Sequence, residues 1–379
     1  MVPMPAPKLL YLVTEDWLFI SHRLPMARAA LAAGFEVHVA TRVGKHAASI
    51  EGEGFVLHPL EWTRGTRTPW GVLTEVSRIR ALLKEIKPDL VHHIALKPVI
   101  LGMLAAMGLG MPVVNSLVGM GSSFIGPSIV SSAKRFLMSR LFVFLFSNPL
   151  VSIIIQNRDD EDYLKGLMIC GSSLDLIPGS GVYTDLLQPC PEPDGPVTFG
   201  FVGRLLHDKG LKTLIDAHLL LQSTHKPFQT LIAGTPDPDN ASSFTEQELS
   251  VYKNIEGLHF LGHVNDIPAL WKNCHVAVLP SRREGLPRSL LEAAACGRPL
   301  LASNVPGCRE IVRHGENGLL FEVDHPNALA EAMEQMIDDP AMRLRMGQCG
   351  RQMVEERFSA HSIGQATVAV YQRALTRKA

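Results

Sequence analysis

The most informative part of the chain is AVLPSRREGLPRSLLEAAACGRPLLASNVPGCREIVRHGENG, residues 277–318. It begins in an apolar run that ends at Pro280 and is typical of a parallel strand covered on both faces. Pro287 then favours the first turn of a helix, and Gly297 is suited to end that helix. Residues 300–302 predict another short buried strand. The stretch therefore predicts a strand, a loop, a helix and a strand of an open α/β sheet.

Two glutamates of this stretch lie where such a sheet binds ligands. Glu284 is in the loop after the strand, and Glu292 is a little over one turn inside the helix. Free N–H groups at a helix start favour phosphate, and carboxylates accept strong hydrogen bonds from pairs of hydroxyl groups. The pattern suits a sugar nucleotide, although the spacing alone equally fits a loop charge and a solvated helix residue.

The pattern Glu-x7-Glu in EGLPRSLLEAAACGRPLLAS (284–303), followed by NVPGCREIV (304–312) and HGENGLLF (314–321), resembles the retaining glycosyltransferases of the GT-B fold. The resemblance covers nearly the whole chain and is strongest after residue 197. It is closest to the branch that builds bacterial capsule and O-antigen sugars on a lipid diphosphate carrier. It implies an α/β protein with two Rossmann-like, doubly wound parallel-sheet domains that face a cleft, where the site is expected.

Length and composition agree with a globular protein of two domains. The chain has 379 residues, a hydrophobic share of 46% and a formal net charge of −1. It has no basic stripe with interleaved aromatic residues, which argues against nucleic acid as a partner. Its six cysteines form no CxxC pair and are expected to be reduced, in a cytoplasmic protein. No signal peptide is expected, and the uncharged residues 98–133 are interrupted by Pro112 and several glycines, so that no spanning helix is expected there.

Strands and helices alternate along both halves of the chain, which predicts parallel sheets. We expect an N-terminal, acceptor-binding and membrane-associated domain over residues 1–187. A linker with four prolines follows at 188–196. A C-terminal nucleotide-sugar-binding domain is expected over 197–357. The resemblance implies that a last helix, 358–379, crosses back to the N-terminal domain.

A second motif, GRLLHDKG at residues 203–210, follows a predicted strand of the C-terminal domain. Its glycines let the backbone approach a diphosphate, and Arg204 and Lys209 can neutralise the charge on a departing nucleoside diphosphate. A solvated strand-to-helix turn would look similar. The resemblance implies that Glu284, Arg204 and Lys209 are catalytic and that Glu292 holds the ribose. It also implies nucleotide-sugar contacts at Gly203, Gly234, Val264, Gly285, Leu286 and Pro287.

The first strand-to-helix loop of the N-terminal domain, DWLFISHRLP at 16–25, resembles the capsule and O-antigen branch. The acceptor-binding residues expected there and after the strand DLVHHI are Asp16, His22, His93 and Lys97. Many relatives carry a histidine at the end of the fifth strand, where this chain has Asn115 and Ser116, so that contact is either missing or supplied by His22 or His93. Relatives also often read Gly-Val-Asp before the linker, and here Tyr183 replaces the carboxylate.

Residues 128–146 predict an apolar helix that carries Lys134, Arg135 and Arg140. Such a helix packs in a core, or it lies on a membrane with its basic residues against anionic headgroups. The resemblance favours the membrane contact, because that family handles lipid-linked acceptors.

The resemblance, together with these features, implies a retaining glycosyltransferase that needs no metal and no cofactor. It would move a hexose or N-acetylhexosamine from a nucleotide sugar, preferably a UDP sugar, to a polyprenyl-diphosphate-linked saccharide at the inner face of the cytoplasmic membrane. Asp237 and Asp239 form a D-x-D pattern that binds metal in a different glycosyltransferase fold, but a proline-rich turn explains them. The alternatives left open are a nucleotide-sugar epimerase on the same fold and a non-catalytic, membrane-associated scaffold.

Overall fold

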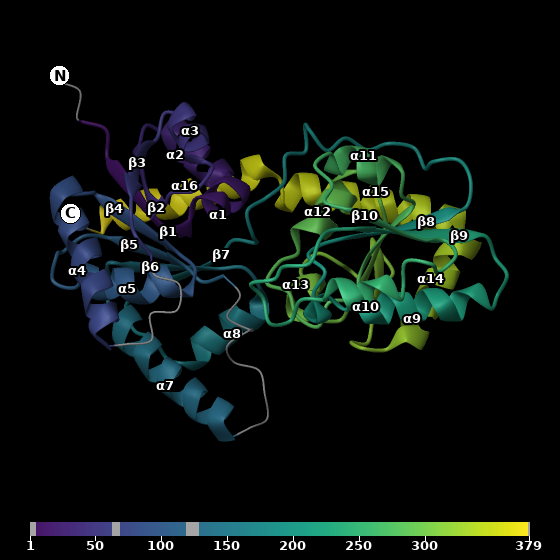
Figure 1. Cartoon of the computed structure of the whole chain (residues 1–379). Helices are drawn as coiled ribbons and strands as arrows, with labels where there is room; N and C mark the ends of the chain where they lie inside the picture. Colours follow the sequence, from purple (N-terminus) through teal and green to yellow (C-terminus); the bar gives the residue numbers. More distant parts are fainter. Residues whose placement is uncertain (1–4, 63–68, 119–128, 378–379) are drawn as a thin grey trace. The chain divides into compact units, whose positions relative to one another are not determined.

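The computed structural model describes residues 5–62, 69–118 and 129–377, apart from the side chains at 69 and 129–135. The chain forms two compact units, each with a parallel sheet between helices (Figure 1). One unit contains the chain up to Gly181 together with the segment from Ala360 onward, and the other is Val182–Ser359. The predicted α/β class, with two parallel sheets, is confirmed.

The N-terminal unit is built on seven strands in the order β3-β2-β1-β4-β5-β6-β7. The strands are β1 (Lys8–Glu15), β2 (Glu36–Arg42), β3 (Val56–Pro59), β4 (Leu90–Ile94), β5 (Val113–Ser116), β6 (Val151–Ile155) and β7 (Ser173–Leu176). Its helices are α1 (Asp16–His22), α2 (Leu24–Ala32), α3 (Ala47–Gly52), α4 (Pro69–Ile86), α5 (Leu96–Ala106), α7 (Ile129–Phe146), α8 (Arg158–Gly166) and α16 (Ala360–Thr376). The strand order reverses between β1 and β4, so the carboxyl ends of these two strands border the crevice in which open sheets bind ligands.

The central strands of this sheet are buried on both faces, as their apolar runs predict. Alternate residues of β1 point to opposite layers. Leu9, Tyr11 and Val13 join the core that includes side chains of α2 and α16. Leu10 and Leu12 join the core that includes α4, α5 and α7. Helix α16 therefore packs as a helix of this unit, against α2.

The C-terminal unit is built on six strands in the order β10-β9-β8-β11-β12-β13. The strands are β8 (Val197–Val202), β9 (Phe228–Ala233), β10 (Leu258–Gly262), β11 (Val276–Leu279), β12 (Leu300–Ser303) and β13 (Gly318–Phe321). Its helices are η1 (His207–Lys209), α9 (Leu211–Gln222), α10 (Glu246–Ser250), α11 (Ile267–Lys272), α12 (Arg288–Ala295), α13 (Pro306–Arg309), α14 (Pro326–Asp338) and α15 (Pro340–Arg357). Here the order reverses between β8 and β11.

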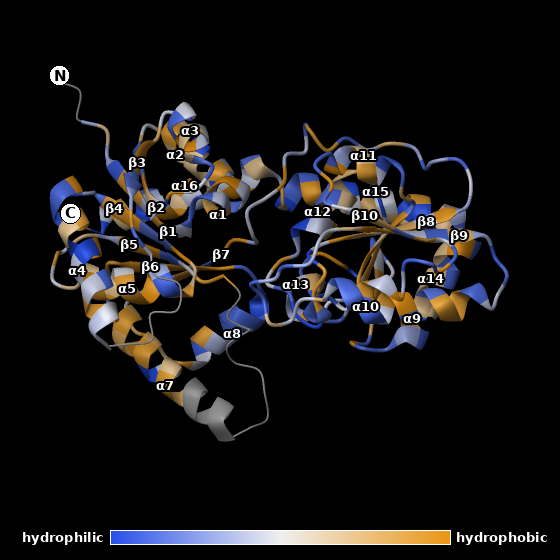
Figure 2. Cartoon of the chain, in the orientation of Figure 1, coloured by the Kyte–Doolittle hydropathy of each residue, from blue (hydrophilic) through white to orange (hydrophobic). Residues whose placement is uncertain are grey.

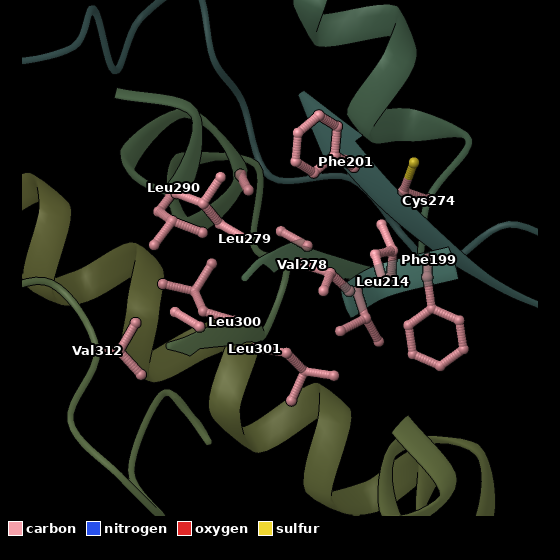
Figure 3. Close-up of a cluster of buried hydrophobic side chains, with 14 of the residues drawn as sticks. Phe199, Phe201, Leu214, Cys274, Val278, Leu279, Leu290, Leu300, Leu301 and Val312 are labelled. Carbon is pink, nitrogen blue, oxygen red and sulfur yellow. The ribbon is translucent and has the colours of Figure 1, made fainter. Parts of the chain in front are cut away.

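The core of this unit explains the apolar runs of the opening stretch. Val278 and Leu279 of β11 lie beside Leu300 and Leu301 of β12, with Phe199 of β8 close by (Figure 3). All are at most 2% exposed, so strands and helices bury each other's apolar faces. These buried strands hold the loops at their carboxyl ends in place.

The local predictions around α12 are confirmed. Pro287 caps the helix at its start, and Gly297 follows its end with a φ of 75°. Pro340 begins α15 and so lies at the boundary between α14 and α15. Strands β7 and β13 were not predicted, because each has only four residues and lies at a sheet edge.

The proline-rich residues 188–196 are tied to the C-terminal unit, and the chain changes unit earlier, at Gly181. The buried guanidinium of Arg298 donates to Cys190 Sγ at 2.7 Å and to the Pro191 carbonyl at 2.8 Å. Glu192 accepts two hydrogen bonds from Arg343, each 2.8 Å long. Long-range polar contacts of this kind leave no signal in the local sequence.

Candidate active site

The carboxyl ends of β8 and β11 bring two of the three predicted catalytic residues together. Lys209, at the end of η1, donates from Nζ to Glu284 Oε1 at 2.6 Å. Ser281 Oγ donates to the same oxygen, also at 2.6 Å. The side chains of Glu284 and Lys209 are 8% and 23% exposed, so the pair is mostly shielded from water. This pairing of a carboxylate with a cation lies at the switch point of the sheet, where ligands bind.

Close backbone contacts hold this pair in position. Gly210 has a φ of 71°, and a Cβ built there would lie 1.8 Å from the carbonyl oxygen of Pro280. A Cβ on Gly307 of α13 would lie 2.6 Å from the carbonyl oxygen of Glu284. Only glycine permits these approaches. Gly307 was missed by the sequence reasoning, although it stands in the quoted motif, because its contact is with a loop that precedes it by a full helix and strand.

The third predicted catalytic residue, Arg204, pairs with a residue that the sequence assigned to a turn. Its Nη1 donates to Asp237 Oδ2 at 2.6 Å. Arg204 is 58% exposed and Asp237 is 28% exposed. The two loops are also joined by backbone, because a Cβ on Gly234 would lie 1.8 Å from the carbonyl oxygen of Gly203. The sequence did not predict that Asp237 pairs with Arg204.

Glu292 lies on α12 and is held by a residue one turn before it. Arg288 Nε donates to Glu292 Oε1 at 2.7 Å, and the Glu292 side chain is 13% exposed. Burial raises the pKa of Glu292 above its ordinary value, and the neighbouring Arg288 opposes this rise. Gly285, Leu286 and Pro287 form the segment that links Glu284 to α12, whereas Val264 follows β10, three strands away from β11.

The buried carboxylate of Asp16 joins two loops of the N-terminal unit. It accepts backbone N–H groups from Trp17 at 2.7 Å, Gly44 at 2.6 Å and His46 at 3.0 Å. Burial would raise the pKa of Asp16, but these three bonds lower it below its ordinary value. Because Asp16 is only 3% exposed and its oxygens are engaged, its observed contacts are those of a structural residue.

We expect Asp16→Asn to lower the free energy of unfolding of the N-terminal unit by about 2 kcal/mol at pH 7, since a charged acceptor of backbone N–H groups is lost. A lowered folded-state pKa stabilises the fold above the unfolded pKa of about 4, and that stability is lost as pH falls through the folded pKa. Urea unfolding of both proteins between pH 7 and pH 3 measures this. A difference that does not shrink in acid would contradict the role of the charge.

His93 is enclosed in the fold. It is fully buried, its Nδ1 donates to Asn115 Oδ1 at 2.8 Å, and burial lowers its pKa to about 4. A Cβ on Gly102 of α5 would lie 2.3 Å from His93 Nε2, so the ring fills the space that this glycine leaves. The structure thus places His93, together with the departure at Asn115, inside the core. Neither residue faces solvent.

The other two predicted acceptor residues lie nearer the surface. His22 is half-buried, and its Nδ1 is 2.6 Å from Ser21 Oγ. Lys97 Nζ donates to the buried Glu75 at 3.0 Å and lies 5.2 Å from the ring centre of Trp62. Lys97 belongs to the first turn of α5, after β4 and so at the switch point of its sheet.

The predicted membrane helix is α7. Lys134 and Arg135 have side chains outside the described part of the structure, and Arg140 is exposed. Phe136 and Leu137 are each 70% exposed and Phe144 is 62% exposed. None of the helices in the described residues is long and apolar enough to cross a membrane. Likewise, the described residues contain no group of three or more His, Cys, Asp or Glu side chains that could hold a metal ion.

Two families match the two units of the chain. Residues 8–165 match the family described as Glycosyl transferase 4-like. Residues 184–353 match the family described as Glycosyl transferases group 1. The Campylobacter jejuni N,N'-diacetylbacillosaminyl-diphospho-undecaprenol alpha-1,3-N-acetylgalactosaminyltransferase is 24% identical over 94% of this chain and 98% of its own length. The Escherichia coli UDP-Gal:alpha-D-GlcNAc-diphosphoundecaprenol alpha-1,3-galactosyltransferase is 28% identical over 72% of each chain.

Solved structures with the same fold cover nearly the whole chain. The sucrose-phosphate synthase of Thermosynechococcus elongatus superposes with a TM-score of 0.81 at 20% identity, covering 98% of this chain and 99% of that one. Anabaena Alr3699/HepE, in complex with UDP and glucose, superposes with a TM-score of 0.75 at 20% identity, covering 97% of this chain and 99% of that one.

Proposed function

Because the chain belongs to the glycosyltransferases of the GT-B fold, we propose that it transfers one sugar, with retention, from a UDP sugar to a polyprenyl-diphosphate-linked saccharide. The relatives from C. jejuni and E. coli are named for undecaprenyl-diphosphate acceptors, which supports this acceptor class. The name of the E. coli relative and the UDP complex of the Anabaena protein support a UDP donor.

The observation that carries this proposal is the shielded pair Lys209–Glu284 at the switch point of the C-terminal sheet. A fixed ammonium group favours the negative charge of a leaving diphosphate, and a fixed carboxylate favours the positive charge of a reacting sugar. Both charges are held in place before the donor binds. The pair therefore needs little reorganisation during the reaction.

In the proposed reaction the bond between the anomeric carbon and the diphosphate oxygen breaks, and the diphosphate leaves with the electron pair. Arg204 and Lys209 stabilise that oxygen, while Glu284 orients the sugar and stabilises its oxocarbenium-like charge. The acceptor hydroxyl bonds to the same face of the sugar. Its proton passes to the departing diphosphate, so the products are the extended lipid-linked saccharide and UDP.

A metal ion is not required in this scheme, since two side-chain cations take the charge of the diphosphate. Asp237, the first residue of the D-x-D pattern, is engaged with Arg204. A divalent cation at Asp237 would compete with that ion pair. We therefore propose that turnover persists in EDTA.

The anionic surface of the cytoplasmic membrane is the proposed partner of α7. Phe136, Arg140 and Phe144 follow one another at intervals of one turn, so they share a face of the helix. The residues in the described part of α7 are mostly hydrophobic (Figure 2). Exposed aromatic side chains around a cation suit the boundary between headgroups and acyl chains. The enzyme would act there, at the inner face, as a peripheral protein.

We expect the double variant Phe136→Ser, Phe144→Ser to bind vesicles of phosphatidylglycerol and phosphatidylcholine at least about tenfold more weakly, because the apolar contact is removed. Arg140→Gln should lower binding about fivefold on these vesicles and leave binding to neutral vesicles unchanged. Vesicle co-sedimentation measures both. Leu344→Ser on α15, whose leucine is 59% exposed, is the matched control. Unchanged binding of the double variant would contradict the contact.

The test of the proposed function is a turnover assay with purified protein, a short polyprenyl-diphosphate sugar and a panel of nucleotide sugars, with and without EDTA. Release of UDP together with the gain of one sugar on the lipid supports the proposal. Turnover that needs added metal would overturn the metal-free scheme. Interconversion of nucleotide sugars without change of the lipid would favour an epimerase, and absence of both turnover and nucleotide binding would favour a scaffold.

A further inference from the structure

We propose that Asp237 is the resting-state partner of Arg204 and that the donor diphosphate displaces it, so that each catalytic cycle exchanges one anion for the other. The inference rests on the proposed function, because it takes Arg204 as a ligand of the diphosphate. It assigns to Asp237 the role of a positioning residue that sets the affinity for the donor and for the released nucleotide.

The two predicted cations of the site are each paired with a carboxylate, but their surroundings differ. The carboxylate that holds Lys209 is 8% exposed, whereas the one that holds Arg204 is 28% exposed, and Arg204 itself is 58% exposed. If Lys209 moved away, a nearly buried carboxylate would lose its cation, which is costly. Separating Arg204 from Asp237 costs little, because water can solvate both groups. Arg204 is therefore the cation that can change partner.

Asp237 is held close to Arg204 by the backbone of both loops. The Gly203 N–H donates to the Ala233 carbonyl at 3.0 Å, and the Leu205 N–H donates to the Thr235 carbonyl at 3.0 Å. The two donors lie on either side of Arg204 in the sequence, and the two acceptors lie four and two residues before Asp237.

The turn that carries Asp237 is itself fixed. The Asp237 N–H donates to Ser243 Oγ at 2.8 Å, and its carbonyl accepts the Asn240 N–H at 2.8 Å. The carboxylate thus stays in place when the guanidinium leaves, and it is ready to receive the guanidinium again when the nucleotide departs.

The difference in charge between Asp237 and the donor diphosphate favours the diphosphate as the partner of Arg204. Asp237 offers one negative charge, whereas a nucleoside diphosphate offers at least two, and a guanidinium binds phosphate oxygens in a bidentate manner. Donor binding is therefore favoured over the resting pair. Release of the nucleotide is assisted in turn, because the vacated Arg204 regains a counter-charge instead of remaining unpaired.

The test compares Asp237→Asn with the unaltered protein in the dissociation constant of the nucleoside diphosphate that the turnover assay releases, measured by calorimetry. We expect the variant to bind this nucleotide about fivefold more tightly, equivalent to about 1 kcal/mol, since the competing carboxylate charge is gone. We expect kcat to fall where nucleotide release limits turnover. Glu246→Gln is the matched control: it removes the same charge from an exposed pair with Lys253 on the same unit.

Weaker nucleotide binding by Asp237→Asn would overturn the exchange and make Asp237 an aid to Arg204 in the bound state. If the activity of the unaltered protein depends on added Mn²⁺ and Asp237→Asn loses that activity, the exchange would be overturned and Asp237 would be a metal ligand. Asp237→Ser repeats the measurement should the asparagine variant fold poorly. In an Arg204→Gln background the Asp237 change should have no effect on the dissociation constant. If Arg204→Gln alone leaves nucleotide binding unaltered, the proposed diphosphate site itself fails, which is a separate result.

Discussion

Glu284→Gln is expected to lower kcat for glycosyl transfer about 100- to 1000-fold, because a fixed charge at the reacting centre is removed while the shape of the side chain is kept. The new amide oxygen would still accept a hydrogen bond from Ser281 or Lys209, which now donate to Glu284 Oε1. Nucleotide binding should change much less than kcat, because the carboxylate is proposed to act on the sugar.

The measurement is the steady-state rate of UDP release with donor and lipid-linked acceptor, together with the dissociation constant of UDP. Glu316→Gln provides the control, since it removes a carboxylate from an exposed pair with Arg313 in the same unit. A Glu284→Gln enzyme that keeps kcat within about threefold of the parent would limit Glu284 to holding Lys209. Lys209→Met should lower kcat by a similar factor. If the double variant of Lys209→Met and Glu284→Gln loses no more kcat than either single variant, the two residues act as a unit.

Gly210→Ala is expected to lower the free energy of unfolding of the C-terminal unit by about 3 kcal/mol and to reduce transfer strongly. Two effects combine at this position. The φ of 71° disfavours a side chain, and the new Cβ would lie 1.8 Å from the carbonyl oxygen of Pro280. To relieve the clash, η1 must move away from the loop after β11, which separates Lys209 from Glu284.

Gly262→Ala separates these two effects. Gly262 has a φ of 67°, and a Cβ there would meet no atom within 4 Å. This control should cost only about 1 kcal/mol from backbone strain and leave transfer nearly intact. Urea unfolding followed by circular dichroism, with kcat measured in parallel, compares the two variants. If Gly210→Ala and Gly262→Ala lost equal amounts of stability and of kcat, the contact with Pro280 would not position the site.

The predicted helix start at Pro287 and helix stop at Gly297 were confirmed, because proline and glycine act on the backbone at their own positions. The apolar runs of the central strands were confirmed for a similar reason, since burial on both faces of a sheet requires apolar residues throughout. Edge strands β7 and β13 were missed, because a four-residue strand at an edge carries little of this signal.

Some of the polar residues of the site could be predicted from the sequence, but their partners could not. Glu284, Arg204 and Lys209 could be predicted as site residues because they are charged and follow predicted strands, and the fold joins Lys209 to Glu284 across 75 positions of the chain. The sequence could not predict that Asp237 is the partner of Arg204, or that Gly307 supports the loop of Glu284. These contacts depend on which strand ends are neighbours in the sheet, and that order is not written in any local pattern.

The α/β class, the family resemblance and the segments of the proposed donor site could be predicted from the amino-acid sequence, because these depend on periodicity and on residue types within short segments. Which of the predicted polar residues remain available to a ligand depends on the tertiary fold and could not be predicted from the sequence. The fold encloses His93 under α5 and commits Asp16 to three backbone N–H groups. The physical reason is that burial and hydrogen-bond partners depend on elements far apart in the chain, and the free energy of a polar group depends on both.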